Sequence, residues 1–397
     1  MLESWRWFGP LDDISLAEVA QTGASGIVTA LHDIPYGEVW AREAIAERKA
    51  QIAAAPGDLH WAVVESLPVH EDIKRGEGDL DRLFGNYRQS MANLAAEGVQ
   101  VICYNFMPLL DWTRTRLDAP VPGGGTALRY SAVEMAFFDI VMLARPGADR
   151  DYPADVVAQA QSLASNTDAE ERQRLLSAIM AGLPGAFARF DVDGLRAALA
   201  PWQGVTADDL RANLKRFLEE VIPTAEDLGL RLCIHPDDPP RPLLGLQRIV
   251  STEADIVQVL DMVDAPSNGL TLCSGSLGAH PDNDVPVMTR RFASRIHFAH
   301  LRNVAKEADG SFQEAAHLDG DTDMPALVAA LLAEEAQRRR AGRADDQIPF
   351  RPDHGHDLLS DAGRPTHPGY PLVGRLRGLA ELRGVIAGLQ HIARITA

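Results

Sequence analysis

A chain of 397 residues, of which 46% are hydrophobic, has enough apolar material for a large core and is too apolar to be mainly disordered. Its 56 acidic residues outnumber its 38 basic residues and give a formal net charge of −18, which argues against nucleic acid and anionic membranes as partners. An anionic small substrate would need a local cation, either a metal ion or an arginine cluster.

The cysteines also limit the class of protein. Cys103, Cys233 and Cys273 are too few and too widely spaced for a disulfide framework. The segment Met1 to Arg6 lacks the charged and apolar regions of a signal peptide. No apolar run reaches the roughly 18 residues that a membrane-spanning helix needs. We therefore expect a soluble, cytoplasmic protein.

Strands and helices alternate at the start of the chain. Four short apolar segments, each bounded by turn-forming residues, are predicted as strands: residues 5–8, 26–31, 60–66 and 100–105. Helical spacing of apolar residues predicts helices between these strands: residues 13–21, 40–54 and 79–97.

The alternation stops between Met107 and Gly229, where no segment is predicted as a strand. Residues 111–130 are predicted to form an exposed loop, and a lid beside a barrel mouth and an ordinary surface excursion both remain open. Helices are predicted over residues 131–143, 154–165, 169–181, 192–200 and 206–226. Thr206 is a typical helix start, and Pro223 should bend the last of these helices or end it early. Because no linker separates the region from its neighbours, residues 107–229 are predicted to be a helical insertion or lid.

The alternation then resumes. Strands are predicted over residues 230–235, 270–273, 295–300 and 347–351, with helices over residues 252–263, 324–341 and 376–389. Eight strands separated by helices predict a parallel (β/α)8 TIM barrel, with a helical insertion between strands 4 and 5 and one catalytic domain over residues 1–397. A doubly wound open sheet is the alternative, but no glycine-rich dinucleotide fingerprint follows any strand.

Four metal-ligand side chains end the last four predicted strands. They are His235, Cys273, His300 and Asp353, and in a barrel they would meet at the rim that carries the active site. Taken singly, Cys273 could be a small buried apolar residue, His235 could shape a turn, and His300 could be a hydrogen-bonded core histidine. His297 lies on the same predicted strand and could be the ligand in place of His300. Together the four donors predict a site for a divalent transition-metal ion.

Further residues near these strand ends could take part in chemistry. A metal at the rim could chelate a carboxylate with its neighbouring hydroxyl and stabilise an enolate as a Lewis acid. His354 could transfer a proton, because histidine is the residue type that titrates nearest neutrality, and Tyr370 could supply a second proton-transfer group, although packing alone would also explain a tyrosine there. Arg302 could pair with a substrate carboxylate or could be a surface arginine.

The same segments carry a family resemblance. The sequence resembles the metal-dependent D-mannonate dehydratases in segments that span almost the whole chain: residues 6–10, 26–32, 64–70, 104–108, 111–115, 235–240, 270–276, 300–302 and 351–356. The resemblance implies a xylose-isomerase-like barrel, a Mn2+ or Fe2+ ion, and conversion of D-mannonate to 2-keto-3-deoxy-D-gluconate with loss of water.

The resemblance also implies roles for individual residues. The metal ligands fall on His235, Cys273, His300 and Asp353, and the acid–base residues fall on His354 and Tyr370. Asn105 and Arg302 are expected to contact the substrate. One of His354 and Tyr370 would take the C2 proton, and the other would help the C3 hydroxyl to leave; which of them is the base stays open.

Three rival functions remain. A metal-dependent sugar isomerase or epimerase on the same barrel would release no water, and a sugar-acid-binding protein would show no turnover. An endonuclease barrel is disfavoured by the net charge of −18. We also expect a homo-oligomer, most simply a dimer.

Overall fold

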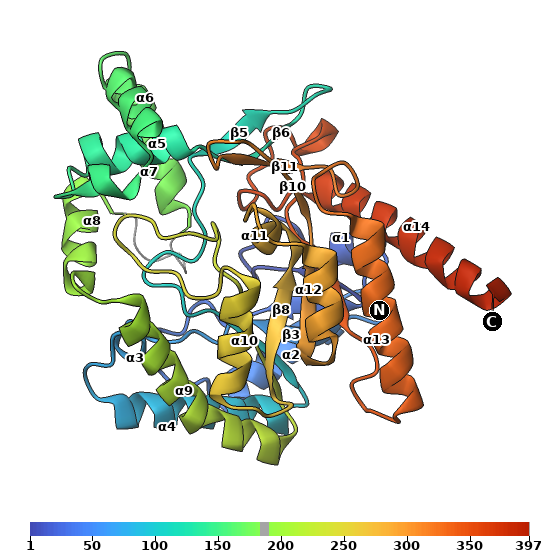
Figure 1. Ribbon diagram of the computed structural model, residues 1–397. Helices are drawn as coiled ribbons and strands as arrows, with labels where there is room; N and C mark the ends of the chain where they lie inside the picture. Colours follow the sequence, from blue (N-terminus) through green and yellow to red (C-terminus); the bar gives the residue numbers. More distant parts are fainter. Residues whose placement is uncertain (183–189, 397) are drawn as a thin grey trace.

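The computed structural model describes residues 1–182 and 190–396, and its centre is a closed barrel of eight parallel strands (Figure 1). The barrel strands are β1 (Leu2–Arg6), β2 (Gly26–Thr29), β3 (His60–Glu65), β4 (Val101–Tyr104), β7 (Arg231–Ile234), β8 (Asn268–Cys273), β9 (Ile296–Leu301) and β12 (Pro349–Pro352). β12 pairs with both β9 and β1, which closes the barrel. The predicted (β/α)8 barrel is confirmed, although the first strand begins three residues before its predicted start.

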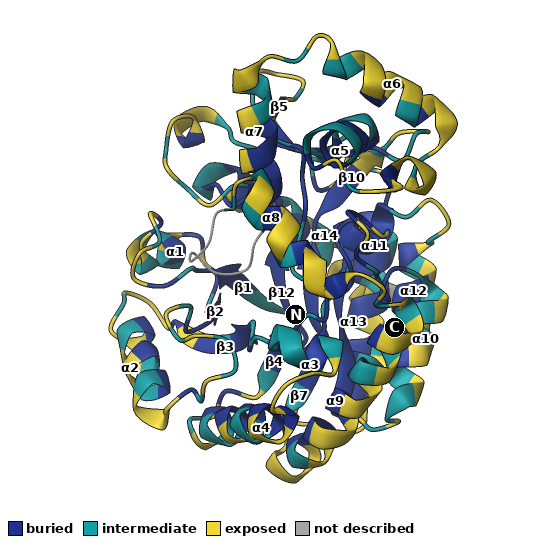
Figure 2. Ribbon diagram, turned by 90° about the vertical axis from the view of Figure 1, so that its left-hand side faces the viewer, coloured by how far each residue is buried: buried dark blue, intermediate teal, exposed yellow. Residues whose placement is uncertain are grey.

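Helices surround the barrel. They are α1 (Leu16–Gln21), α2 (Arg42–Ala53), α3 (Glu71–Arg75), α4 (Leu80–Ala96), α9 (Ala207–Leu228), α10 (Glu253–Met262), α11 (Ser274–Gly278), α12 (Val285–Phe292), α13 (Met324–Arg340) and α14 (Leu372–Thr396), with single turns at Ala293–Arg295 and Leu359–Asp361. Their exposed faces point away from the strands, and their buried faces point toward them (Figure 2). Across residues 1–182 and 190–396, no helix combines the length and apolar character that crossing a membrane requires.

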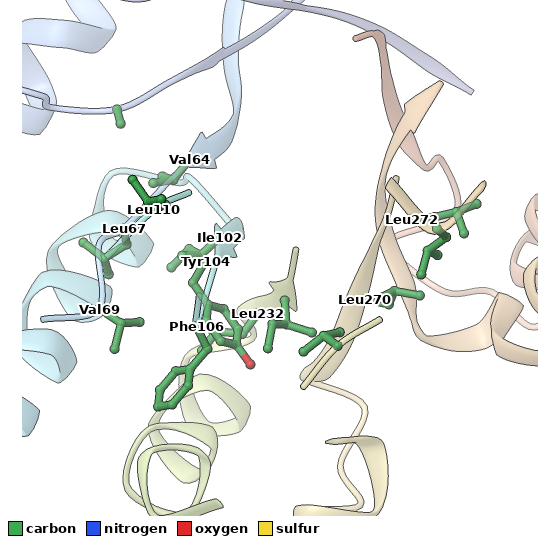
Figure 3. Close-up of a cluster of buried hydrophobic side chains, with 14 of the residues drawn as sticks. Val64, Leu67, Val69, Ile102, Tyr104, Phe106, Leu110, Leu232, Leu270 and Leu272 are labelled. Carbon is green, nitrogen blue, oxygen red and sulfur yellow. The ribbon is translucent and has the colours of Figure 1, made fainter. Parts of the chain in front are cut away.

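Alternation along the barrel strands divides the core in two. Side chains on one face of each strand pack against the helices; Ile102, Leu232 and Leu270 belong to this outer cluster (Figure 3). The intervening residues form a small cluster of their own inside the barrel: Val28, Val63, Cys103, Cys233 and Phe298. Because successive side chains of a strand point to opposite faces, the residue two positions further along each strand points inward at the carboxyl rim.

Between β4 and β7 the described residues form, besides α9, four α-helices that lie together at one end of the molecule (Figure 1). They are α5 (Ala132–Phe137), which continues as a π-helical turn (Phe138–Met142), α6 (Ala154–Ala164), α7 (Ala169–Met180) and α8 (Val192–Leu199), with short turns at Ala148–Asp151 and Ala200–Trp202. The predicted helices of this region are therefore present in the described residues.

The prediction that this segment lacks strands was wrong. It contains the hairpin of β5 (Arg116–Pro120) and β6 (Thr126–Tyr130), which joins β10 (Asn303–Lys306) and β11 (Phe312–Ala315) in a second sheet. Most of residues 111–130 is therefore structured and not an open loop. β5 buries only Ala119, so it lacks a clear alternating pattern, and β6 pairs with β11, which follows it by about 180 residues. A local pattern could not reveal that partner.

Pro223 does not end helix α9, which continues to Leu228. Thr206 caps the helix as predicted, through a capping box with Asp209. Pro223 and Glu219, whose carbonyl loses its helical N–H partner, are both exposed, so water can solvate that carbonyl. The opposite face, with Val221 and Ile222, is buried and holds the helix on the barrel.

Candidate active site

A cavity of about 320 Å³ opens at the carboxyl rim of the barrel. Its lining includes Glu65, Asn105 and His235, each of which lies two residues after a member of the inner cluster. The polar rim is thus the next inward-facing layer above an apolar barrel interior, as the period of two along a strand requires.

Three of the four predicted metal ligands form one group. His235 follows β7, Cys273 ends β8, and His300 lies on β9. One donor atom from each lies within 4.8 Å of the others, and His235 Nε2 is 3.1 Å from His300 Nδ1. Cys273 and His300 are fully buried, and among the described residues His300 Nε2 has no hydrogen-bond partner. Two imidazoles and a thiol are suitable ligands for a divalent transition metal, so this group can hold one.

Asp353 lies beside this group. Its Oδ2 atom is 3.7 Å from Cys273 Sγ and 4.0 Å from His300 Nδ1. Both of its carboxylate oxygens already accept hydrogen bonds from arginine, Oδ2 from Arg302 Nε at 2.8 Å and Oδ1 from Arg351. The structure thus places Asp353 next to the metal-capable group, with its carboxylate engaged by two guanidinium groups.

The charges around this group keep Cys273 and Asp353 in their anionic forms. Burial alone would raise the pKa of the Cys273 thiol, but Arg302 and hydrogen bonds with His235 and His300 hold it well below its usual value. Burial would likewise raise the pKa of Asp353, but Arg351 and the neighbouring histidines hold it well below the usual carboxyl value. Both groups are therefore in the ionised form that a metal ion binds.

The two predicted proton-transfer residues, His354 and Tyr370, both line the cavity. Their rings meet edge to face, with centroids 5.1 Å apart. The Tyr370 hydroxyl donates to Asp353 Oδ1 at 3.4 Å, and burial raises the pKa of Tyr370 above its usual value, so the phenol stays protonated. His354 Nδ1 lies 3.0 Å from Oε1 of Glu314, a buried residue of β11.

The two predicted substrate contacts differ in their surroundings. Asn105 lines the cavity, and its Nδ2 donates to Asp111 Oδ1 at 2.8 Å. Arg302 is 1% exposed and is not among the lining residues. Its guanidinium donates to Asp353, to Glu314 at 2.8 Å and to Asp238 at 2.7 Å. The N–H groups of Arg302 that a substrate carboxylate would need are thus already bound to three carboxylates of the protein. This geometry does not support a direct contact between Arg302 and the substrate.

Several residues of the site were missed in the sequence. Glu65 ends β3 and lies 3.5 Å from His300 Nε2, Arg6 ends β1, and His32 lies three residues after β2. Arg6 and Glu65 lie within predicted strands and His32 directly follows one, so their place near strand ends was a usable signal. Glu314 gave no local signal, because β11 is recognisable only through its pairing with β6 and β10.

A closed (β/α)8 barrel with a nitrogen- and sulfur-donor group at its carboxyl rim defines a barrel enzyme whose active site can hold a divalent metal ion. The sequence profile of the D-mannonate dehydratase (UxuA) family matches residues 1–396. The chain therefore belongs to this family, as the resemblance in its strand-end segments predicted.

Individual relatives agree with this assignment. The chain is 54% identical to a mannonate dehydratase of Chromohalobacter salexigens over 394 residues, which cover 99% of this chain and 100% of that protein. It is 50% identical to a mannonate dehydratase of Marinomonas sp. over 391 residues, with 98% and 99% coverage. The crystal structure of mannonate dehydratase from Streptococcus suis superimposes with a TM-score of 0.76 at 34% identity and covers 99% of this chain and 94% of that chain.

Proposed function

We propose that the protein is a hydro-lyase that converts D-mannonate to 2-keto-3-deoxy-D-gluconate, with residues 1–397 acting as one catalytic domain. The observation that carries the proposal is the grouping of His235, Cys273 and His300 beside a cavity that is also lined by His354 and Tyr370. Membership of the D-mannonate dehydratase family supports the substrate.

The proposed metal site consists of His235, Cys273, His300 and Asp353, and the proposed ion is Mn2+ or Fe2+. Asp353 would have to turn its carboxylate from the arginines toward the ion to become the fourth ligand. The bound ion would supply Lewis-acid stabilisation of the enolate that forms when a carbon acid next to a carboxylate loses its proton.

His354 is proposed as the base that takes the C2 proton. The Glu314 carboxylate accepts the hydrogen bond from Nδ1–H, so in the neutral imidazole Nε2 is the nitrogen that can accept a proton. Tyr370 is proposed as the acid, because a protonated phenol can donate to the departing C3 hydroxyl. Water leaves, and the enol product tautomerises to the 2-keto acid. Asn105 remains a proposed contact of the substrate hydroxyl groups.

The decisive experiment is a keto-acid assay. The metal-free protein is reloaded with Mn2+, Fe2+, Mg2+ or Zn2+ and given D-mannonate. We expect keto acid with Mn2+ or Fe2+; an isomerised or epimerised hexonate without loss of water would instead identify the rival isomerase, and binding without turnover would identify a binding protein. His354→Ala should abolish turnover while retaining the metal.

Two cysteine substitutions, one at a proposed ligand and one beside the site, test the metal site. Cys273→Ala should weaken metal binding at least about tenfold, because a direct ligand should contribute no less than a residue that only orients one. Cys233→Ala removes a thiol from the barrel interior two residues before His235 and should retain the metal. Metal content after dialysis measures both. Equal retention by the two variants would exclude Cys273 as a ligand.

Three further properties are proposed. Residues 107–229 are proposed to act as a lid, because Trp112 and Ala181 from this segment line the cavity. A cytoplasmic location is proposed because all three cysteines are free thiols, and expression with a fused fluorescent protein would test it. A dimer is proposed, and light scattering during size-exclusion chromatography would test it.

A further inference from the structure

The cavity is lined by one cation that forms no ion pair within the described residues. Three lysine or arginine side chains of the described residues line it: Arg6, Lys74 and Arg351. Lys74 pairs with Glu71 at 2.7 Å, and Arg351 pairs with Glu65 at 2.8 Å.

Arg6 differs from both. It is 7% exposed, and its hydrogen bonds within the described residues are long and go to uncharged groups: Nη1 to the carbonyl of Val28 at 3.4 Å and Nη2 to His32 Nε2 at 3.3 Å. Within residues 1–182 and 190–396, no carboxylate lies within ion-pair distance of its guanidinium. A buried charge without a counter-ion is costly, so this arrangement favours an anion brought in by a ligand.

The surroundings of Arg6 hold its guanidinium in place. The ring of Phe8 lies 4.5 Å from its central carbon and covers one face. Burial and the nearby Arg6 and Arg48 lower the pKa of His32 to about 3, so His32 is neutral and its Nε2 accepts from Arg6. The guanidinium is therefore fixed by a ring and a neutral imidazole, and its charge stays available.

The arginines on the two sides of the site differ in whether carboxylates pair with them. Arg302, on the β9 side, contacts Asp238, Glu314 and Asp353, whereas Arg6 and Arg48, on the β1–β2 side, form no ion pair within the described part of the chain. In a protein of net charge −18, two arginines without an ion pair favour the binding of an anion on this side of the site.

We propose that Arg6 binds the carboxylate of the sugar-acid substrate and thereby sets the preference for an acid over the corresponding neutral polyol. This inference rests on the proposed function for the identity of the substrate. A carboxylate has about four lone-pair sites on two oxygens, so it can accept from the fork of a guanidinium and still contact a second group.

The test compares D-mannonate with D-mannitol, which has the same carbon chain without the carboxylate. Binding to the metal-free and the Mn2+-loaded protein is measured by calorimetry, for the wild type, Arg6→Met and Arg6→Lys. We expect Arg6→Met to weaken mannonate binding by about 10- to 100-fold, the usual loss of a hydrogen bond to a charged group, and to leave mannitol binding unchanged. Arg6→Lys should recover part of the loss, because it keeps the charge without the fork.

Arg48→Met is the matched control. Arg48 is also buried, also lies near His32 and also forms no ion pair in the described residues, but it stacks on Trp7 and does not line the cavity. Mannonate affinity in Arg48→Met should stay close to that of the wild type. Mannonate binding to Arg6→Met with wild-type affinity would overturn the inference; if that variant does not fold, an Arg6→Lys affinity equal to that of the wild type for mannonate and other hexonates would do so.

The two proposals fail in different ways. Absence of keto acid from the metal-loaded wild type refutes the proposed function. The role of Arg6 is judged from the ratio of hexonate to polyol affinity, which needs no turnover and can be measured with any hexonate that the wild type binds.

Discussion

Glu314 shows how a single residue can organise the proposed base. Its Oε1 atom accepts from Arg114 and Arg302, both at 2.8 Å, and lies 3.0 Å from His354 Nδ1. Burial would raise the pKa of Glu314, but Arg302, His354 and Arg114 hold it well below the usual carboxyl value. A carboxylate at Nδ1 selects the neutral tautomer with its proton on that nitrogen, so Nε2 is the nitrogen that accepts a proton, which makes Glu314 a positioning residue.

Glu314→Gln should therefore lower kcat by about 10²- to 10⁴-fold, the usual contribution of an effective general base, and change KM little. Metal content should stay at the wild-type level, because Glu314 is not a proposed ligand. Glu307→Gln, which changes an exposed glutamate of the β10–β11 connection, is the control and should turn over normally. An unchanged kcat in Glu314→Gln would remove its role in positioning His354.

The sequence revealed individual site residues where they follow barrel strands. His235, Cys273, His300 and Asp353 could be found because an alternating strand carries its side chains to a known rim. The partners of Arg302 could not be found, because Asp238, Glu314 and Asp353 approach it from three separate parts of the chain. An isolated arginine after a strand looks the same in sequence whether it meets a substrate or a carboxylate.

At the scale of elements, residues 111–113 join the insertion to the barrel. The Asp111 amide donates to the carbonyl of Gly182, after α7, and the Thr113 amide donates to the carbonyl of Asp238, after β7. Trp112, between them, lines the cavity and meets the ring of His354 edge to face at 6.0 Å. A ligand in the cavity would contact this connection directly.

If residues 107–229 form a lid, D-mannonate should slow amide hydrogen exchange in residues 109–114, because a bound ligand removes local opening from the ensemble. Exchange measured by mass spectrometry with and without D-mannonate checks this. The exposed end of α14, residues 387–395, should exchange equally in both samples. Equal exchange of residues 109–114 would show that the segment is an ordinary surface excursion.

The barrel and the second sheet show what local patterns can predict. The eight barrel strands were predictable because each carries its own apolar segment. β5, β6, β10 and β11 were not, because the pair β5–β6 and the pair β10–β11 form one sheet only through the pairing of β6 with β11. Long-range pairing leaves no local signal, so the sheet that supplies Glu314 was missed.

At the scale of the whole molecule, stability should depend on pH through buried histidines. His297 is 3% exposed, and its Nε2 lies 2.9 Å from the carbonyl of Pro266. Burial, followed by the charges of Arg338 and Arg231, lowers its pKa to about 3. The unfolded chain gains this proton below about pH 6.5, whereas the folded protein does not. The resulting stability is present above pH 6.5 and is lost as the pH falls toward 3.

His297→Gln should remove this dependence. Between pH 7 and pH 5 the wild type should lose about 2 kcal/mol more free energy of unfolding than the variant, since a histidine that stays neutral in the fold contributes about 1.4 kcal/mol per pH unit below its unfolded pKa. Urea titrations at the two pH values measure the difference. His60→Gln, at an exposed position, is the control and should follow the wild type. Identical slopes for the wild type and His297→Gln would contradict the prediction.

Pairing between β1 and β12 has a consequence for synthesis of the protein on the ribosome. Until residue 352 has been translated and has left the exit tunnel, the nascent sheet has two open edges, at β1 and β9. Open edges attract strands of other chains, so incomplete translation products should aggregate or need chaperones. Asp353 and His354 emerge immediately after the closing strand, so the rim that carries the proposed active site is completed only when the barrel has closed.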